Sequence, residues 1–457
     1  MKGYVPTPDW IVDLMVAKLF ASGGPAPEAR ILDPGCGRGA FIDGLIRWCT
    51  ARGVAIPHIT GVESNPVHAD FLRKRFSASP TVVIREADFL TGSLDPFDFI
   101  IGNPPYVALT GLDETERQLY RSLFRTARGR FDLYFLFFEQ SLRLLAEGGK
   151  LVFITPEKFL YVQTAARLRA LLSRANVQEL HFLDEGAFDD LVTYPVVTSL
   201  SRSDIIQPTR VIARSGATTR VQLKEDGASW LPALNGRKDE QSSRTLADLC
   251  ARISCGVATG ADPIFVVRKD GLPAALRRYA YPTVAGRDLT PDAPAKMPNV
   301  MLLPYTRDGR LLPEDELGAL GTYLGQSHRR AKLLARTCAR RKPWYAFHEN
   351  PPMHDLLRPK LLCKDIGSIP HFVVDPAGEI VPRHSTYYLI PRDSSMLGPL
   401  ADYLNSPGPV EWLRGNCQRA ANGYIRLQSH VLRQLPVPDE VASAYDTSSE
   451  NLIGLAA

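Results

Sequence analysis

The 457-residue sequence predicts an α/β fold, in which a doubly wound parallel sheet is followed by a mixed, β-rich α+β domain. Three observations predict it: apolar runs alternate with helical periodicities over residues 1–200, turn residues bound these runs, and the later sequence has short apolar runs with few long helices. Strands that alternate with helices form parallel sheets with helices on both faces. Ligands bind beyond the carboxyl ends of such strands. The residues that directly follow each strand are therefore the first candidates for a functional site.

The first part of the chain contains five predicted strands, which are ARIL before Asp33, HITGV before Glu63, TVVI before Arg85, FDFII before Gly102 and KLVFIT ending at Thr155. Helical patterns precede or separate them, and they lie after Pro8, after Gly39, after Pro66 and from Asp132 to about Leu145. From about residue 203 the strands fade into polar, turn-rich sequence. We therefore predict a first domain over 1–202, a transition or linker over 203–245, a second domain over 246–442 and a flexible tail over 443–457.

The composition excludes several classes of protein. With 45% apolar and 23% charged residues, the chain is close to the globular average. No apolar run reaches the roughly 18 residues of a membrane-spanning helix, and the first residues lack the pattern of a secretory signal. Seven cysteines without a C-x-x-C pair predict neither a disulfide framework nor a structural zinc site. We therefore expect no metal and a cytoplasmic location.

The charge is unevenly distributed along the chain. Residues 1–200 hold 21 Lys and Arg against 23 Asp and Glu, whereas the remaining residues hold 33 against 26. A basic second half suggests an anionic partner such as nucleic acid, although ordinary scatter of surface charge is the alternative. The segment from Arg329 to Lys342 is rich in basic residues and precedes Pro343-Trp344-Tyr345. This combination suits a phosphate-binding, strand-prying surface, and an exposed charged helix is the alternative.

A glycine-rich turn, Asp33-Pro34-Gly35-Cys36-Gly37-Arg38-Gly39, directly follows the first predicted strand. Glycines let the backbone turn tightly and approach a ligand closely. The spacing G-x-G-x-G departs from the dinucleotide fingerprint G-x-G-x-x-G, in which helix N–H groups bind a pyrophosphate. S-adenosylmethionine has no phosphate and ends in an amino acid, whose ammonium group Asp33 can hold. The turn therefore favours S-adenosylmethionine, and a plain strand-to-helix turn is the alternative.

Two acidic residues follow the next two strands. Glu63 suits a ribose diol, because a carboxylate accepts hydrogen bonds from both vicinal hydroxyls. Asp88 with Phe89 suits an adenine, since the carboxylate can accept from the exocyclic amine while the ring packs on the base. Taken alone, each has an ordinary alternative: Glu63 as a solvated loop acid, and Asp88 as a helix cap before a core phenylalanine.

The motif Asn103-Pro104-Pro105-Tyr106 follows the fourth strand. Two consecutive prolines fix the backbone and remove two N–H donors. The Asn103 amide oxygen and the Pro104 carbonyl oxygen then form a rigid pair of acceptors for a planar amine with two N–H donors. Tyr106 is placed to stack on the ring that carries this amine. A proline-rich turn is the alternative.

Together these motifs resemble the S-adenosylmethionine-dependent N6-adenine DNA methyltransferases of the gamma class. In that class a cofactor motif, here Val5-Pro6-Thr7-Pro8, comes first, and the target-recognition domain comes last. Further matches in the first part are Phe131-Asp132-Leu133-Tyr134, Leu151–Thr155 and Pro156. Less specific matches in the second part are Thr259-Gly260, Gly286-Arg287-Asp288, Tyr403-Leu404-Asn405, Gly423-Tyr424 and Leu435-Pro436-Val437-Pro438.

The resemblance implies a Rossmann-like methyltransferase domain over 1–202 and a DNA target-recognition domain over 246–442. It implies direct in-line methyl transfer to the N6 amine of a flipped-out adenine in double-stranded DNA. The implied catalytic residues are Asn103, Pro104, Pro105, Tyr106 and a second stacking aromatic, Phe188, with Tyr194 in reserve. The implied contacts to S-adenosyl-L-methionine are Thr7, Pro8, Asp33, Gly35, Cys36, Gly37, Glu63, Ser64, Asp88, Phe89 and Asn103. Either Phe188 or Tyr194 could instead be a core residue.

The resemblance also implies a restriction–modification setting with a cognate restriction endonuclease, and we expect a stand-alone, monomeric modification enzyme. Two other functions stay open. An enzyme with the same Asn-Pro-Pro-Tyr motif could act on RNA or on a protein glutamine, which the long basic second half disfavours. A DNA-specificity subunit without activity is the other alternative, and the intact glycine turn and Asn103–Tyr106 motif disfavour it.

Overall fold

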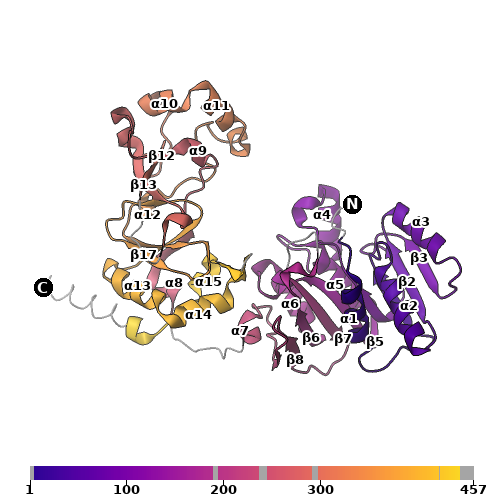
Figure 1. Cartoon of the computed structure of the whole chain (residues 1–457). Coiled ribbons are helices and arrows are strands. Elements are labelled where there is room, and N and C mark those ends of the chain that lie inside the picture. The colour runs from indigo at the N-terminus through magenta and orange to yellow at the C-terminus, as the bar shows by residue number, and fades with distance from the viewer. Residues whose placement is uncertain (1–4, 189–193, 236–243, 291–296, 421–422, 443–457) are drawn as a thin grey trace. The chain divides into compact units, whose positions relative to one another are not determined.

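The computed structural model describes residues 5–188, 194–235, 244–290, 297–420 and 423–442 (Figure 1). The chain divides into two compact units, Met1–Lys238 and Asp239–Ala457. Each unit has its own sheets and its own apolar cores, so each is described separately. The predicted tail over 443–457 lies outside the described residues.

The first unit is built on a nine-stranded sheet of order β3-β2-β1-β4-β5-β7-β6-β8-β9. The five predicted strands are all present, as β1 (Arg30–Pro34), β2 (His58–Glu63), β3 (Val82–Glu86), β4 (Phe97–Gly102) and β5 (Leu145–Pro156). They pair in parallel, so their carboxyl ends meet at one edge. The chain order reverses direction between β1 and β4, which is the position where open α/β sheets bind ligands.

The other strands make the sheet mixed, because they add antiparallel pairs to the parallel pairing of the five predicted strands. These strands are β6 (Asn176–Phe182), β7 (Pro195–Ser201), β8 (Thr209–Ile212) and β9 (Thr218–Val221). β7 lies antiparallel between β5 and β6, and β9 is antiparallel to β8. Antiparallel neighbours need no crossover helix. The alternation of strands and helices that predicts parallel pairing accordingly ends after β5.

Helices cover both faces of this sheet, as predicted (Figure 1). Side chains of a strand point alternately to its two faces. Accordingly Leu32 and Ile100 belong to one apolar core and Ile31 and Ile101 to another. The first core includes α5 (Leu133–Leu144), and the second includes α1 (Asp9–Leu19), α2 (Ala40–Arg52) and α3 (Pro66–Arg75). The doubly wound prediction is therefore confirmed for this part of the sheet.

Two further helices of the first unit, α4 (Glu114–Leu123) and α6 (Ala166–Leu172), were not predicted. A capping box begins α4: the Asp113 carboxylate accepts from the Glu116 N–H, and the Glu116 side chain accepts from the Asp113 N–H, both at 2.8 Å. Such a reciprocal pair satisfies two N–H groups that a helix start leaves unpaired. The helix is amphipathic, and it buries Tyr120 against the core.

The first unit extends past the predicted domain boundary at residue 202. Within the segment predicted as a linker, β8 and β9 join the sheet, and α7 (Leu231–Leu234) follows Trp230, which is fully buried. The buried Arg169 guanidinium donates to the backbone carbonyls of Gly227, Ala228, Phe159 and Val162. Burial lowers the pKa of Arg169 to about 10. The polar sequence of this segment gives no signal of this packing. The segment is held by a few contacts with distant residues and not by a periodic apolar face.

The second unit is mixed and rich in short strands, as predicted. One four-stranded sheet has the order β11 (Cys250–Cys255), β19 (Thr386–Pro391), β15 (Lys360–Lys364) and β17 (Phe372–Asp375). The other has the order β12 (Val266–Arg268), β14 (Asn299–Leu302), β13 (Ala280–Val284) and β18 (Val381–Pro382). Two small sheets join β16 (Ile366–Gly367), β21 (Ile425–Arg426) and β20 (Gln418–Arg419), and β10 (Arg244–Thr245) with β22 (Pro436–Val437).

The helices of the second unit are short: α8 (Leu246–Leu249), α9 (Asp262–Phe265), α10 (Gly318–Leu324), α11 (Ser327–Leu334), α12 (Met353–Leu356), α13 (Leu397–Asn405), α14 (Pro407–Asn416) and α15 (Ser429–Arg433). Throughout the described part of the chain, no helix is both long and apolar enough to cross a membrane. The seven cysteines are free. Within the same residues, no group of three His, Cys, Asp or Glu side chains is arranged to hold a metal ion.

The packing of Trp230 makes the domain boundary testable. Its indole N–H donates to the Lys224 carbonyl at 2.9 Å, and its ring meets that of Phe159 edge-on. Trp230→Ala should therefore lower the free energy of unfolding by about 3–5 kcal/mol, measured by chemical denaturation with circular dichroism. Trp10→Ala, at a tryptophan that is 54% exposed, should change it by no more than about 0.5 kcal/mol. Equal effects of the two changes would contradict the extended boundary.

Candidate active site

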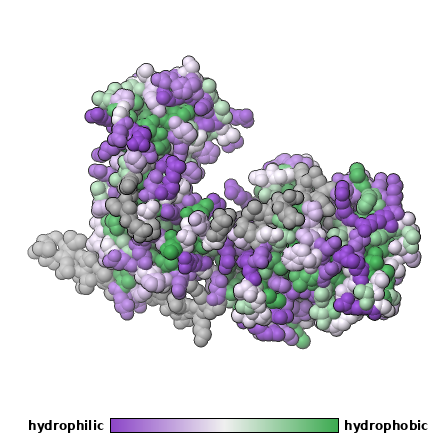
Figure 2. Space-filling model, in the orientation of Figure 1, coloured by the Kyte–Doolittle hydropathy of each residue, from purple (hydrophilic) through white to green (hydrophobic). Residues whose placement is uncertain are grey.

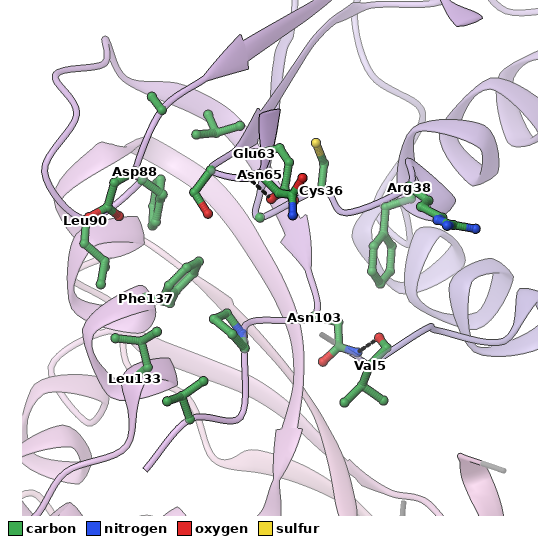
Figure 3. A pocket seen from close by; sticks show the side chains of 18 of the residues that line it. Val5, Cys36, Arg38, Glu63, Asn65, Asp88, Leu90, Asn103, Leu133 and Phe137 are labelled. Carbon is green, nitrogen blue, oxygen red and sulfur yellow. Dashed lines mark hydrogen bonds between the residues drawn. The ribbon is translucent and has the colours of Figure 1, made fainter. Parts of the chain in front are cut away.

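A pocket of about 520 Å³ opens at the carboxyl ends of β1–β4, within the size range of small-molecule sites (Figure 3). The sequence-predicted residues that line it are Thr7, Gly35, Cys36, Glu63, Ser64, Asp88, Phe89, Asn103 and Pro105. The sheet order β3-β2-β1-β4 brings them together, because each lies near the end of one of four neighbouring strands or in the segment before α1. Neighbouring strands lie about 4.8 Å apart. The polar groups are therefore spread along the edge of the sheet rather than clustered at one point.

The glycine turn between β1 and α2 forms one wall of this pocket. Gly35, Gly37 and Gly39 have φ angles of 89°, 56° and 87°, which L side chains rarely adopt. Gly39 precedes the first residue of α2, and a Cβ there would lie 2.8 Å from the Leu72 side chain. The chain can therefore turn from β1 into α2 at this distance only with glycine.

Asp33 lies under this turn, fully buried at the end of β1. Neither of its carboxylate oxygens has a hydrogen-bond partner among the described residues. Burial, and secondly the charge of Glu63, raise the pKa of Asp33 well above its ordinary value. A buried carboxylate without a partner is unfavourable, and a cation or donor that reaches it would relieve this.

Glu63, at the end of β2, accepts hydrogen bonds from the N–H groups of Gly37 and Asn65, both at 2.8 Å (Figure 3). The two bonds reach different oxygens of the carboxylate, so each oxygen keeps a further acceptor position. Glu63 therefore fixes the glycine turn and also presents acceptors to the pocket, where it is 7% exposed.

Asp88 follows β3 at another part of the pocket wall (Figure 3). Phe89, the next residue, also lines the pocket. The Asp88 carboxylate accepts from the Leu90 N–H at 2.9 Å and from the Tyr120 hydroxyl at 3.3 Å. Phe89 is buried, and its ring centre lies 5.0 Å from that of Phe137 on α5. No helix begins directly after Asp88 in the described part of the chain, so its bond to Leu90 holds a turn over 89–91 and the helix-cap alternative does not apply.

Asn103 follows β4 and faces the segment before α1 (Figure 3). Its amide nitrogen donates to the Val5 carbonyl at 3.2 Å and to the Thr7 hydroxyl at 3.1 Å. These two bonds use both amide hydrogens and fix the orientation of the side chain. The amide oxygen is buried, and no described residue donates to it. Asn103 therefore presents a fixed acceptor at the pocket.

The remaining predicted residues do not line this pocket. Asp33 is fully buried at the end of β1. Pro8 precedes the first residue of α1, Gly37 is held by Glu63, and Pro104 is buried. Tyr106 is half-buried, its hydroxyl donates to the Ile154 carbonyl at 3.4 Å, and its ring meets Tyr134 edge-on.

The two candidates for the second stacking aromatic differ in exposure. Phe188 is 3% exposed and belongs to the apolar core with Leu183 and Ala187. In this conformation Phe188 fits the alternative that it is a core residue. Tyr194 is half-exposed, and the Arg214 guanidinium lies 5.1 Å from the centre of its ring.

Sequence reasoning missed one whole wall of the pocket. Leu112, Glu116 and Tyr120, in and beside α4, line it together with Leu133 and Phe137 of α5. Helix α4 carries no glycine or proline motif, and the available signals were its amphipathic pattern and the Asp113–Glu116 capping box. Its contact with the pocket depends on tertiary packing.

In the second unit, the structure divides the basic segment into two groups. Arg329 stacks on Tyr323, Arg336 donates to the carbonyls of Thr259 and Trp344, and Lys342 donates to His348 and Asn350. By contrast Lys332, Arg340 and Arg341 are exposed, and their side chains form no hydrogen bond or ion pair with a described residue. Hydrophilic residues are prominent at this end of the second unit (Figure 2).

Several of the less specific motifs have structural contacts in the second unit. Asp288 pairs with Arg383 at 2.9 Å and accepts from the Ala285 N–H. The Asn405 amide exchanges two hydrogen bonds with the backbone of Phe372 in β17. These residues join separate strands and helices, which is a sufficient reason for their presence.

The first unit fits S-adenosylmethionine on the evidence of its donor and acceptor groups. The buried carboxylate of Asp33 lacks a partner that an ammonium group would supply. Glu63 offers acceptors for a diol, and Asp88 lies beside the packed rings of Phe89 and Phe137. The glycine turn has the spacing G-x-G-x-G and therefore lacks the G-x-G-x-x-G spacing that binds the pyrophosphate of a dinucleotide.

Comparisons with known proteins agree with this geometry. Residues 68–188 match the Eco57I restriction-modification methylase family. The type II methyltransferase M.PaeR7I of Pseudomonas aeruginosa is 26% identical over 94% of this chain and 84% of its own length. M.BstVI of Geobacillus stearothermophilus is 26% identical over 96% of this chain and 90% of its own length. The predicted resemblance to methyltransferases of restriction–modification systems is therefore confirmed.

Solved structures support the fold over nearly the whole chain. The DrdV–DNA complex matches with a TM-score of 0.56 at 13% identity, covering 95% of this chain and 55% of that chain. The type ISP restriction–modification enzyme LlaGI, in complex with a DNA substrate mimic, matches with a TM-score of 0.53 at 13% identity, covering 85% of this chain and 48% of that one. This chain thus corresponds to about half of each of these larger chains.

The unpaired carboxylate of Asp33 gives a stability prediction. The pKa of Asp33 is higher in the folded protein than in the unfolded chain, where it is about 4. The folded state is therefore destabilised as the pH rises from about 4 through the folded-state pKa, because the buried carboxyl group must ionise. Asp33→Asn should therefore raise the unfolding temperature of the ligand-free protein at neutral pH, and this advantage should shrink toward pH 4. Thermal unfolding between pH 4 and 8 measures it, with the exposed Asp95→Asn as the control. A difference that does not depend on pH would contradict the assignment.

Proposed function

We propose that the protein is a DNA methyltransferase that transfers the methyl group of S-adenosylmethionine to the N6 amine of an adenine. The observation that carries this proposal is the fixed, buried amide oxygen of Asn103, which lacks a donor among the described residues and follows directly on β4. An exocyclic amine has the N–H groups that such an oxygen accepts. The relatives are named type II methyltransferases, which supports methyl transfer as the reaction.

The sheet order supports one orientation of the cofactor. Along the edge of the sheet, Asp88 follows β3, Glu63 ends β2, Asp33 lies in β1 and Asn103 follows β4. This is the order of groups expected for adenine, ribose, amino acid and target amine. The proposal therefore assigns Asp88 to the adenine of the cofactor, Glu63 to its ribose and Asp33 to its ammonium group.

When bound, S-adenosylmethionine supplies an electrophilic methyl group on a sulfonium sulfur. Asn103 accepts a hydrogen bond from the target amine, so that the nitrogen lone pair is directed toward the methyl carbon. With the Pro104 carbonyl oxygen as second acceptor, it also stabilises the positive charge that develops on the nitrogen. Catalysis is then mainly positioning, with the reacting atoms held about 3–3.5 Å apart. Tyr106 stacks on the target base, and Tyr194 is favoured over Phe188 for its other face, because Phe188 is buried in this conformation.

The second unit is proposed as the DNA target-recognition domain. Lys332, Arg340 and Arg341 are exposed cations that the fold does not use, and such residues bind phosphates. Restriction–modification relatives also support a cognate endonuclease as a partner, and RM.Eco57I is named as both a restriction enzyme and a methyltransferase. The second candidate function is methyl transfer to RNA or to a protein glutamine. It keeps the same catalytic residues and differs from the first only in the molecule that the second unit binds.

The first predicted variant removes the proposed acceptor. Asn103→Ala should lower kcat by about 10²–10³-fold, by analogy with the loss of one preorganised contact to a developing charge. Binding of S-adenosylmethionine should be retained, and calorimetry measures it separately from transfer of a labelled methyl group. Asn176→Ala, which removes a buried amide bonded to Ser201 on β7, serves as the control and should keep its kcat. Near-normal turnover of Asn103→Ala would contradict the mechanism.

The second variant removes the three free cations of the basic segment. Changing Lys332, Arg340 and Arg341 to Ala should weaken DNA binding and reduce the slope of log K against log salt by about 0.9 per lost phosphate contact. Fluorescence anisotropy at several salt concentrations measures the slope. Arg310→Ala, at an exposed arginine that pairs with Asp308, is the matched control. An unchanged slope would exclude this surface from phosphate contact.

The experiment that tests the whole proposal is transfer from labelled S-adenosylmethionine to unmethylated genomic DNA, followed by nucleoside analysis. N6-methyladenine in one sequence context is the expected product. Label in RNA or protein instead would keep the catalytic assignment and overturn that of the second unit. Absence of both binding and transfer would favour an inactive specificity subunit.

A further inference from the structure

The contact between α4 and the loop after β3 involves one hydroxyl group whose position is informative. Tyr120 extends from α4 into the pocket wall, where its hydroxyl donates to Oδ2 of Asp88 at 3.3 Å. The other oxygen of the same carboxylate, Oδ1, accepts from the Leu90 N–H at 2.9 Å. Asp88 is therefore held from two sides, by its own loop and by a helix that is distant in the sequence.

Helix α4 is itself fixed at both ends, so Tyr120 is a rigid support. The Asp113–Glu116 capping box holds its start. Just beyond its end, the buried carboxylate of Glu139 on α5 accepts from the N–H groups of Arg125 and Thr126. The ring of Tyr120 is buried in the core and contacts Phe124 edge-on. Its hydroxyl thus cannot move without moving the helix.

We propose that Tyr120 is a positioning residue that orients the Asp88 carboxylate and thereby sets the preference of the pocket for adenine in the cofactor. This inference rests on the proposed function, in which Asp88 accepts from the exocyclic amine of that adenine. Because each carboxylate oxygen of Asp88 already accepts one hydrogen bond, the orientation of the carboxylate is fixed. An acceptor position that remains on it then faces the pocket in a fixed direction. A 6-amino group can donate to it, whereas the 6-oxo group of hypoxanthine is an acceptor and would be repelled.

Tyr120 remains a donor under working conditions. Burial, and secondly the charge of Asp88, raise the pKa of the Tyr120 hydroxyl far above neutrality. The hydroxyl proton is therefore always available to Asp88, and the positioning does not change with pH in the physiological range.

The test compares two stable ligands that differ only at the base, S-adenosylhomocysteine and S-inosylhomocysteine, by calorimetry with the full chain. The wild-type protein should prefer the adenine ligand. Tyr120→Phe, which keeps the buried ring, should bind the adenine ligand about three- to tenfold more weakly, as expected for one lost hydrogen bond, and should bind the inosine ligand equally well. The ratio of the two affinities, adenine ligand over inosine ligand, should therefore fall by the same roughly three- to tenfold. Tyr345→Phe, which removes a hydroxyl bonded to Leu312 in the second unit, should change neither affinity.

A double-mutant cycle separates positioning from packing. In the Asp88→Asn background, Tyr120→Phe should have no further effect on the ratio of the two affinities, because residues that act through one another are not additive. An equal loss of affinity for both ligands, or an additive effect in the cycle, would overturn the positioning role. A wild-type preference that Tyr120→Phe leaves intact would also overturn it. If the wild-type protein bound neither ligand, the proposed function itself would fail.

Discussion

The parallel pairing of β3, β2, β1 and β4 is the constraint on which the site depends. Because parallel strands end at the same edge of a sheet, the residues that follow them are placed in the order of the strands. Asp88, Glu63, Asp33 and Asn103 therefore line up although they are distant in the sequence. Glu63, Asp88 and Asn103 line one pocket in this way, and Asp33 is buried beside them at the end of β1.

Two polar groups at this edge lie in conformations that are unfavourable for the protein alone. The Asp33 carboxylate and the Asn103 amide oxygen are buried without a donor among the described residues. Such groups reduce stability unless a ligand supplies the missing partner. Their presence side by side in one edge of the sheet is therefore a stronger indication of function than any single motif. The apolar cores on both faces of the sheet supply the stability that tolerates them.

The surroundings of these groups are rigid rather than adaptable. Asn103 is held by the segment before α1, Glu63 is bonded to the glycine turn, and Asp88 is held by Tyr120. In each case the partner comes from another element of the fold, so the orientation of the acceptor is set before a ligand arrives. Preorganisation of this kind reduces the free energy that must be spent on ordering the site.

The sequence by itself determined the five parallel strands, the covering helices and the polar residues at the ends of the strands that line the pocket. It could do so because strand and helix periodicities are local, and because the motifs directly follow the strands. Only the tertiary structure decided that β7 lies antiparallel, that the first unit continues past residue 202 through Trp230, and that Phe188 is buried. It also decided that α4 brings Tyr120 to Asp88. These features depend on contacts between distant segments, and such contacts leave no periodic pattern in the chain.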